Sequence, residues 1–91
     1  LINGERRGLT VVGIYPSVVR NNASISISSA AQAQVETLVT DIAGRVHQRI
    51  RSQVPAGSSL LNLDASTLAN GYYQVTIIHN GNRETLRFLK N

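Results

Sequence analysis

The stretch VETLVTDIAGRVHQRI, residues 35–50, decides the fold because it fits two kinds of secondary structure. Taken about 3.6 residues apart, its apolar residues form the stripe of an amphipathic helix: Val35, Leu38, Val39, Ile42, Val46 and Ile50. Taken two residues apart, alternate residues form the inward faces of two strands: Val35, Thr37 and Val39, then Val46, Gln48 and Ile50. In the second interpretation the strands join near Ala43 and Gly44, and the chain becomes a small β domain.

Intrinsic propensity favours the hairpin. The β-branched residues are concentrated in residues 35–42, and each of them is slightly disfavoured in a helix. Gly44 would lie within the helical stripe, where it costs roughly 1 kcal/mol relative to alanine. The stretch also lacks a good helix cap at its start. We therefore predict antiparallel strands at residues 35–41 and 45–52, joined by a turn at residues 42–44.

The rest of the chain consists of short segments with strand propensity, separated by turn signals. These segments are LTVVGIYP, ASISISS, LLNLD, YYQVTIIH and RETLRFLK. Asn80 and Gly81 separate the last two segments and favour a type I′ hairpin turn. The residues expected to face the core are Ile25, Ile27, Leu68, Tyr73, Val75, Ile77, Leu86 and Phe88. This spacing of strands predicts an all-β sandwich or barrel.

Length and composition limit the number of domains and the classes of partner that this chain could have. A chain of 91 residues suits one domain, which we assign to residues 9–91, with residues 1–8 as a linker or the end of a preceding domain. The chain has no methionine, so we expect it to be a piece of a longer precursor. Its formal charge of +4 suits an acidic partner. Nucleic acid is not an expected partner, because aromatic residues make up only 4% of the chain and base stacking needs them.

No catalytic, metal or cofactor site is expected. Cysteine is absent, His47 and His79 are the only histidines, and the sequence has no cluster of Asp and Glu, so a metal site is not expected. The serines fall on expected strand faces and turns, and the Gly-x-Ser-x-Gly motif is absent. The sequence therefore does not predict an enzyme.

Four segments resemble, in order and spacing, the type A Por secretion system C-terminal sorting domain of Bacteroidetes. They are YPSVVRN, VTDIAGRV, VPAGSSLLNLDASTLANGYYQV and ETLRFLKN, and together they extend from about Tyr15 to Lys90. The positions that match the family's motifs are Tyr15, Pro16, Asp41, Gly44, Arg45, Gly57, Leu63, Asp64, Leu68, Gly71, Tyr73, Phe88 and Lys90. Ser17 and Val18 depart from the family's Tyr-Pro-Asn-Pro segment, so the double-proline turn is missing here.

The resemblance implies both a fold and a function. The implied fold is an immunoglobulin-like antiparallel β-sandwich of about seven strands. The implied function is that of a C-terminal signal, which directs an N-terminal cargo domain of the same precursor across the outer membrane through the type IX secretion system. The implied partners are that system's outer-membrane translocon and sortase components, with anionic lipopolysaccharide as a further candidate.

The resemblance also implies the route by which the protein is exported. The protein would pass through the periplasm, and a surface sortase would cleave within residues 1–8 or just before them. The cargo would then be secreted or attached to lipopolysaccharide at the cell surface.

Basic residues alternate along the second predicted strand. On a regular strand Arg45, His47, Arg49 and Arg51, here called the basic stripe, would share one face, opposite Val46, Gln48 and Ile50. Such a stripe can protect a sheet edge from pairing with another chain. It can also dock an acidic component of the export machinery or lipopolysaccharide. The sequence leaves both roles open.

The closing segment RFLK also has two interpretations. Leu86 and Phe88 are expected in the core, whereas the resemblance places part of the export signal at this end of the family. A terminal strand with free backbone groups could add to the sheet of a partner. Lys90 and Asn91 are expected to be exposed.

The competing function is an immunoglobulin-like or fibronectin-like accessory domain that binds carbohydrate or spaces other domains. Carbohydrate sites usually present exposed aromatic rings, and this chain offers Tyr15, Tyr72, Tyr73 and Phe88. If Tyr73 and Phe88 belong to the core, too few rings remain for a stacking platform.

Overall fold

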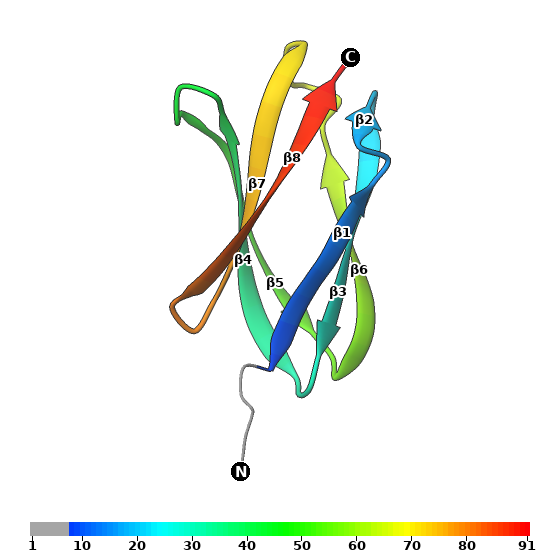
Figure 1. Cartoon of the computed structure of the whole chain (residues 1–91), viewed down its shortest axis with the longest axis vertical. Helices are drawn as coiled ribbons and strands as arrows, with labels where there is room; N and C mark the ends of the chain where they lie inside the picture. The colour runs from blue at the N-terminus through cyan, green and yellow to red at the C-terminus, as the bar shows by residue number, and fades with distance from the viewer. Residues whose placement is uncertain (1–7) are drawn as a thin grey trace.

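The computed structural model describes residues 8–91, which form two β-sheets packed face to face (Figure 1). The strands are β1 (Leu9–Tyr15), β2 (Val18–Val19), β3 (Asn22–Ser29), β4 (Ala33–Asp41), β5 (Val46–Val54), β6 (Gly57–Asp64), β7 (Gly71–His79) and β8 (Asn82–Lys90). The predicted all-β sandwich is confirmed. The part of the chain described here contains no helix that could cross a membrane. Of the expected linker, residues 1–8, all but Gly8 lie outside the described residues.

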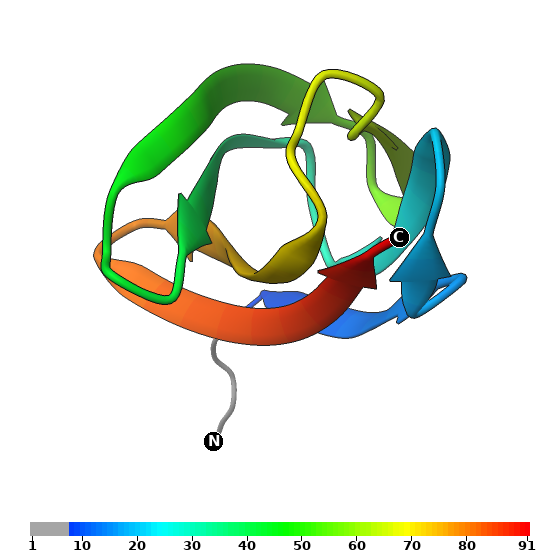
Figure 2. The same cartoon turned by 90° about the horizontal axis from the view of Figure 1, so that it is seen from above.

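One sheet has the strand order β1-β3-β6, and the other has the order β2-β8-β7-β4-β5. Seen from one end, the strands surround a single core (Figure 2). Neighbouring strands are antiparallel except β2 and β8, which run parallel. The resemblance implied about seven strands. The additional strand is β2, which has only two residues and therefore shows no alternation.

Residues 35–50 form the predicted hairpin of β4 and β5, and the helical interpretation is wrong. The inward residues of β4 are Val35, Thr37 and Val39, all buried as predicted. Gly44 has a φ of +89°, a backbone conformation that favours glycine, and it allows the chain to reverse after β4.

The predicted inward row of β5 is interrupted by a β-bulge. The pairing of β4 with β5 shifts by one residue between Val39↔Gln48 and Thr40↔Val46, so His47 has no partner in the register. Val46 therefore lies opposite Thr40, on the outer face of the sheet, and is exposed. The prediction that Val46 faces inward is wrong, because the extra residue reverses the alternation at this point.

The core lies between the two sheets. The predicted inward residues Ile25, Ile27, Val75 and Ile77 are buried, and so is Leu68 in the loop between β6 and β7. The remaining members of the buried apolar cluster are Leu9, Val11, Val19, Ala23, Val35, Val39, Val54, Leu63, Ala65, Tyr73 and Phe88. Alternation along the strands therefore identified most of the core correctly.

A two-residue turn joins β7 to β8. Asn80 has a φ of 49° and Gly81 a φ of 79°, and type I′ turns require positive φ at both positions. His79 pairs with Asn82 at the base of the turn. The hairpin predicted from Asn-Gly is confirmed.

Tyr73 is the aromatic centre of the core. Its ring stacks on Phe88, with the ring centroids 5.5 Å apart and the planes inclined by 17°. Its hydroxyl donates a hydrogen bond of 2.6 Å to the carbonyl oxygen of Ala69, four residues earlier. This bond fixes the loop between β6 and β7 to the start of β7, as a tyrosine corner does in immunoglobulin-like folds.

We predict that Tyr73→Phe lowers the free energy of unfolding by about 1–3 kcal/mol, because it leaves a part-buried carbonyl without its hydrogen bond. Tyr72→Phe is the matched control, since Tyr72 is the neighbouring residue and is exposed. That control is expected to change the free energy by less than about 0.5 kcal/mol. Denaturant-induced unfolding measures both values. Equal losses in the two variants would contradict the role assigned to the Tyr73 hydroxyl.

Candidate functional site

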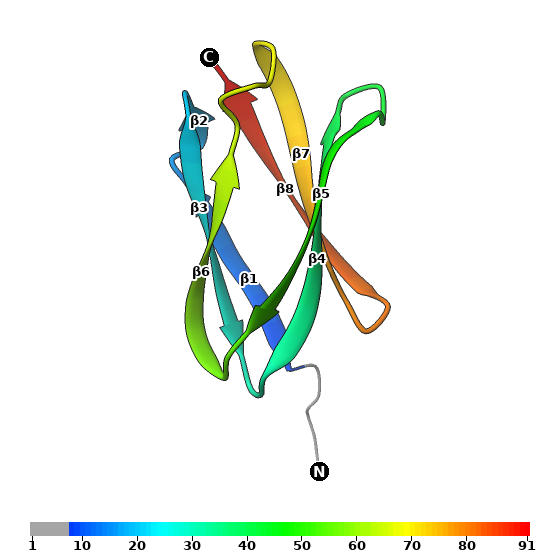
Figure 3. The same cartoon turned by 180° about the vertical axis from the view of Figure 1, so that it is seen from behind.

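The residues that match the sorting-domain motifs are scattered along the sequence but gather at one end of the sandwich. We call this end the motif pole; in Figures 1 and 3 it is the upper end, which carries the C-terminus. Its motif residues are Tyr15, Pro16, Asp41, Gly44, Arg45, Leu63, Asp64, Leu68, Gly71, Tyr73, Phe88 and Lys90.

The up-and-down course of the strands explains the gathering. Strands β1, β4, β6 and β8 end at the motif pole, and β3, β5 and β7 begin there. Gly57 is the exception, because it lies at the opposite end, where β5 turns into β6. Its φ of +99° suits that turn, so Gly57 serves the fold rather than the pole.

Most motif residues of the pole belong to a buried set or to an accessible set. Leu63, Leu68, Tyr73 and Phe88 are buried and belong to the core. Tyr15, Gly44, Arg45 and Asp64 are exposed, and their side chains or backbone can be contacted by another molecule. The buried set holds the accessible set in place.

The end of the chain is more enclosed than expected. Lys90 is only 9% exposed, so the prediction that it is exposed is wrong. It pairs with Gly71 of β7 on one side and with Val19 of β2 on the other. The long aliphatic stem of a lysine can be buried in this way while its ammonium group reaches the surface.

The end of β8 also has few free backbone groups. The backbone N–H of Leu89 donates to the carbonyl of Ser17 at 2.9 Å, and that of Asn91 donates to the carbonyl of Val19 at 3.0 Å. Strand β7 occupies the other edge. Of the two interpretations of RFLK, the folded domain supports the core role, because the end of this segment is already paired on both sides.

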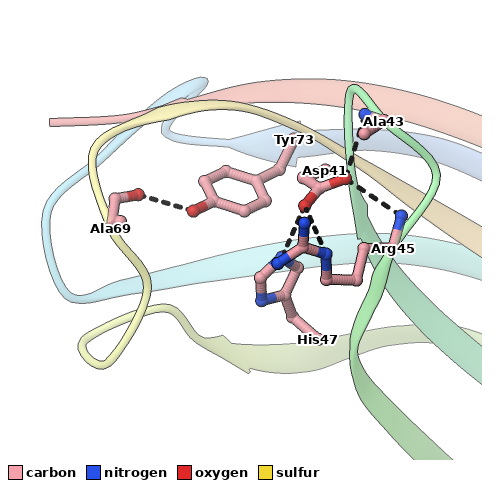
Figure 4. A network of polar contacts seen from close by, with 6 residues as sticks. All are labelled: Asp41, Ala43, Arg45, His47, Ala69 and Tyr73. Carbon is pink, nitrogen blue, oxygen red and sulfur yellow. Dashed lines mark hydrogen bonds and ion pairs between the residues drawn. The ribbon is translucent and has the colours of Figure 1, made fainter.

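Asp41 organises the turn between β4 and β5 (Figure 4). Its Oδ1 accepts hydrogen bonds from the backbone N–H groups of Ala43 and Arg45, both at 2.9 Å. Its Oδ2 lies 2.9 Å from His47 Nε2 and 3.8 Å from Arg45 Nε. The ring of His47 also meets the buried Tyr73 edge-on, with the centroids 5.5 Å apart. The turn is thus tied to the aromatic centre of the core.

Hydrogen bonding stabilises the ionised form of two carboxylates at the pole. The bond from His47 and those from the backbone of Arg45 and Ala43 hold the pKa of Asp41 below its ordinary value of 3.8. Asp64 accepts bonds from the hydroxyl and backbone N–H of Ser66, which lower the pKa of Asp64 as well. Both carboxylates are charged at neutral pH, and both are engaged within the domain.

The basic stripe does not lie on one face, and the bulge at His47 is the reason. His47 turns toward Asp41 and Tyr73, with Arg45 beside the same carboxylate. Arg49 and Arg51 lie on the outer face, where their Nε atoms are 3.3 Å and 3.9 Å from Glu36 Oε2. The prediction of a single continuous face is wrong.

Exposed apolar side chains complete the pole. They are Tyr15, Val18, Ile42, Val46 and Tyr72. Arg87 lies over the ring of Tyr72, with its Cζ 5.9 Å from the centroid. Sequence reasoning counted Tyr72 among the rings that could be exposed but did not place it at the pole, because that placement depends on the strand topology. No pattern pointed to Val18, because β2 is too short to show one.

We predict that Asp41→Asn lowers the melting temperature at pH 6 but not at low pH. Because the folded pKa of Asp41 is depressed, its contribution to stability is complete above its unfolded pKa and is lost as the pH falls through the folded value. The difference between the two proteins should close as the pH falls below 3.8. Thermal unfolding from pH 6 downward measures it. A difference that is independent of pH would show that the charge of Asp41 does not stabilise the turn.

Comparison with known protein families assigns the chain to one of them. Residues 13–91 match the secretion system C-terminal sorting domain, and this range includes every motif residue of the pole. No curated protein matches the chain. The match covers most of the 91 residues. The chain therefore belongs to the family of type IX secretion system C-terminal sorting domains.

Proposed function

We propose that the motif pole is the surface by which the type IX machinery recognises this sorting domain. The observation that carries the proposal is the gathering of scattered motif residues at one end of the sandwich (Figure 1). A purely structural motif would be expected to spread through the core, whereas Tyr15, Gly44, Arg45 and Asp64 are exposed.

The placement of the first strand supports this proposal. Strand β1 begins at Leu9, at the end of the sandwich opposite the motif pole. A cargo domain that precedes β1 in the precursor would therefore be joined at the far end. The translocon could hold the pole without a clash with the cargo.

The chemistry of the pole indicates the kind of surface that would bind it. Its accessible groups include the guanidinium of Arg45 and the apolar side chains of Tyr15, Val18, Ile42, Val46 and Tyr72. Its carboxylates, Asp41 and Asp64, already accept internal hydrogen bonds. A partner surface that combines apolar and acidic residues would complement this pole.

The two halves of the basic stripe receive different proposed roles. Arg45 and His47 belong to the pole and contribute to recognition. Arg49 and Arg51 pair with Glu36 along the edge strand β5, and we assign them the protection of that edge from other chains. Docking of lipopolysaccharide on a continuous stripe is not part of the proposal, because the bulge divides the stripe.

For the steps after recognition, we propose the route that the family resemblance implies. A surface sortase would cleave within residues 1–8 or just before them, after passage through the periplasm. The cargo would then be released or attached to lipopolysaccharide. The domain itself needs no catalytic residue or cofactor for this role, since it acts by being recognised.

The proposal predicts that export depends on the accessible residues of the pole. In a bacterium with the type IX system, the chain is fused to the C-terminus of a neutral exported reporter. The double variant Arg45→Gln, Tyr72→Gln should strongly reduce the reporter outside the cell and increase it in the periplasm. The reason is that it removes one cation and one ring from the proposed contact surface.

The matched control is Val12→Gln, Arg83→Gln, which removes one exposed apolar residue and one exposed arginine away from the pole. It should be exported like the unmodified fusion. Thermal unfolding of each domain shows whether the fold persists. Equal export of the two folded variants would contradict recognition at the motif pole.

A further inference from the structure

Charge is distributed unequally between the two sheets. Across all three strands of the β1-β3-β6 sheet, the one charged residue is Asp64, at the very end of β6. The strands of the other sheet carry Glu36, Asp41, Arg49, Arg51, Arg83, Glu84, Arg87 and Lys90. The domain therefore has one neutral sheet and one charged sheet.

The edge strands of the two sheets differ in their protection. β5 has a bulge at His47 and the exposed cations Arg49 and Arg51. β1 has a register shift between Val11 and Gly13. β1 also lies close to β8, since the backbone N–H of Val11 is 3.4 Å from Glu84 Oε2. Bulges, cations and covering segments all discourage pairing with a further strand.

Strand β6 has none of these protections along most of its length. Its register with β3 is unbroken over all eight residues, from Gly57 to Asp64. The strand contains no lysine, arginine or proline. Leu60, at its middle, is 70% exposed. Among the hydrogen bonds of residues 8–91, one from another strand reaches this edge, at its end, where Gln48 Nε2 donates to the carbonyl oxygen of Asp64 at 2.7 Å.

We propose that β6 pairs antiparallel with β6 of a second copy of this chain, so that two three-stranded sheets become one six-stranded sheet. An open strand edge presents alternate unpaired N–H and C=O groups, and only another extended backbone satisfies them in series. Two-fold symmetry requires that the same patch be complementary to itself. The neutral, unbroken edge of β6 meets that requirement.

Charge does not oppose contact between two copies at β6. Two chains that each carry a net charge of +4 repel one another where their cations face. Strand β6 carries no cation, whereas the edge strand β5 carries Arg49 and Arg51. The repulsion between two copies is therefore weaker at β6 than at β5.

The side chains select one register. If Leu60 lies opposite Leu60 of the second copy, then Ser58 lies opposite Asn62 on the same outer face. On this outer face apolar residues pair with apolar residues and polar residues with polar ones, whereas on the inner face Ser59 lies opposite Leu61. Because the two strands are antiparallel, the two motif poles point in opposite directions, and Asp64, at the end of β6, is the motif residue of each pole that lies beside the contact. The association is therefore compatible with the proposed export role and does not depend on it.

Sedimentation of the chain over a range of concentrations tests the proposal. The unmodified chain should form a dimer as its concentration rises. Leu60→Lys places two like charges opposite one another and should raise the dimer dissociation constant by roughly tenfold or more. An equimolar mixture of Leu60→Lys and Leu60→Glu should restore association, because opposite charges then meet across the axis.

The matched control is Val12→Lys. Val12 lies in β1, at the other edge of the same sheet, and is 66% exposed. This variant should dimerise like the unmodified chain, and thermal unfolding checks that each variant is folded. A chain that stays monomeric up to about 1 mM would overturn the proposal. So would a dimer that Leu60→Lys and Val12→Lys weaken equally, or one that neither affects.

Discussion

The packing of Tyr73 is the constraint on which the rest of the domain depends. Its hydroxyl holds the loop between β6 and β7, its ring stacks on Phe88 of β8, and its edge meets His47 of β5. Asp41, at the end of β4, is paired with Tyr73 in the register and bonded to His47. The Tyr73 side chain thus contacts the preceding loop, β8 and β5, and the backbone pairing of Tyr73 adds β4.

This connection explains why the motif residues both stabilise the fold and determine which groups are exposed at the motif pole. The buried members, Leu63, Leu68, Tyr73 and Phe88, fill the core beneath the pole. The accessible members lie on a turn and on strand ends that pack against this core. A change in the buried set would therefore alter the displayed surface even without contact with a partner. Stability has to be measured alongside export for every variant of the motif.

Much of the fold could be predicted from the sequence because its signals are local. The hairpin of β4 and β5 followed from β-branched residues and Gly44, and the turn between β7 and β8 followed from Asn80 and Gly81. Alternation identified the inward faces of β3, β4 and β7. The resemblance named the motif residues, but their meeting at one pole depends on the strand topology.

The errors arose where tertiary structure overrides local pattern. The bulge at His47 inserts one residue, which reverses the alternation and divides the basic stripe. Lys90 is buried because β2, some seventy residues earlier in the chain, pairs with the end of β8. A parallel pair of two residues leaves no trace in a single sequence. The exposure of Val18, Ile42 and Val46 was likewise hidden, since exposure at a strand end depends on which loops surround it.

The central claim is that the motif pole is the surface that the machinery recognises. Amide hydrogen exchange of this domain, alone and bound to purified outer-membrane components of the type IX system, tests that claim most directly. The account predicts that binding slows exchange in residues 42–45 and residues 65–71, at the pole. Slowed exchange confined to the turn at Asn80 and Gly81, or to the edge of β6, would contradict it.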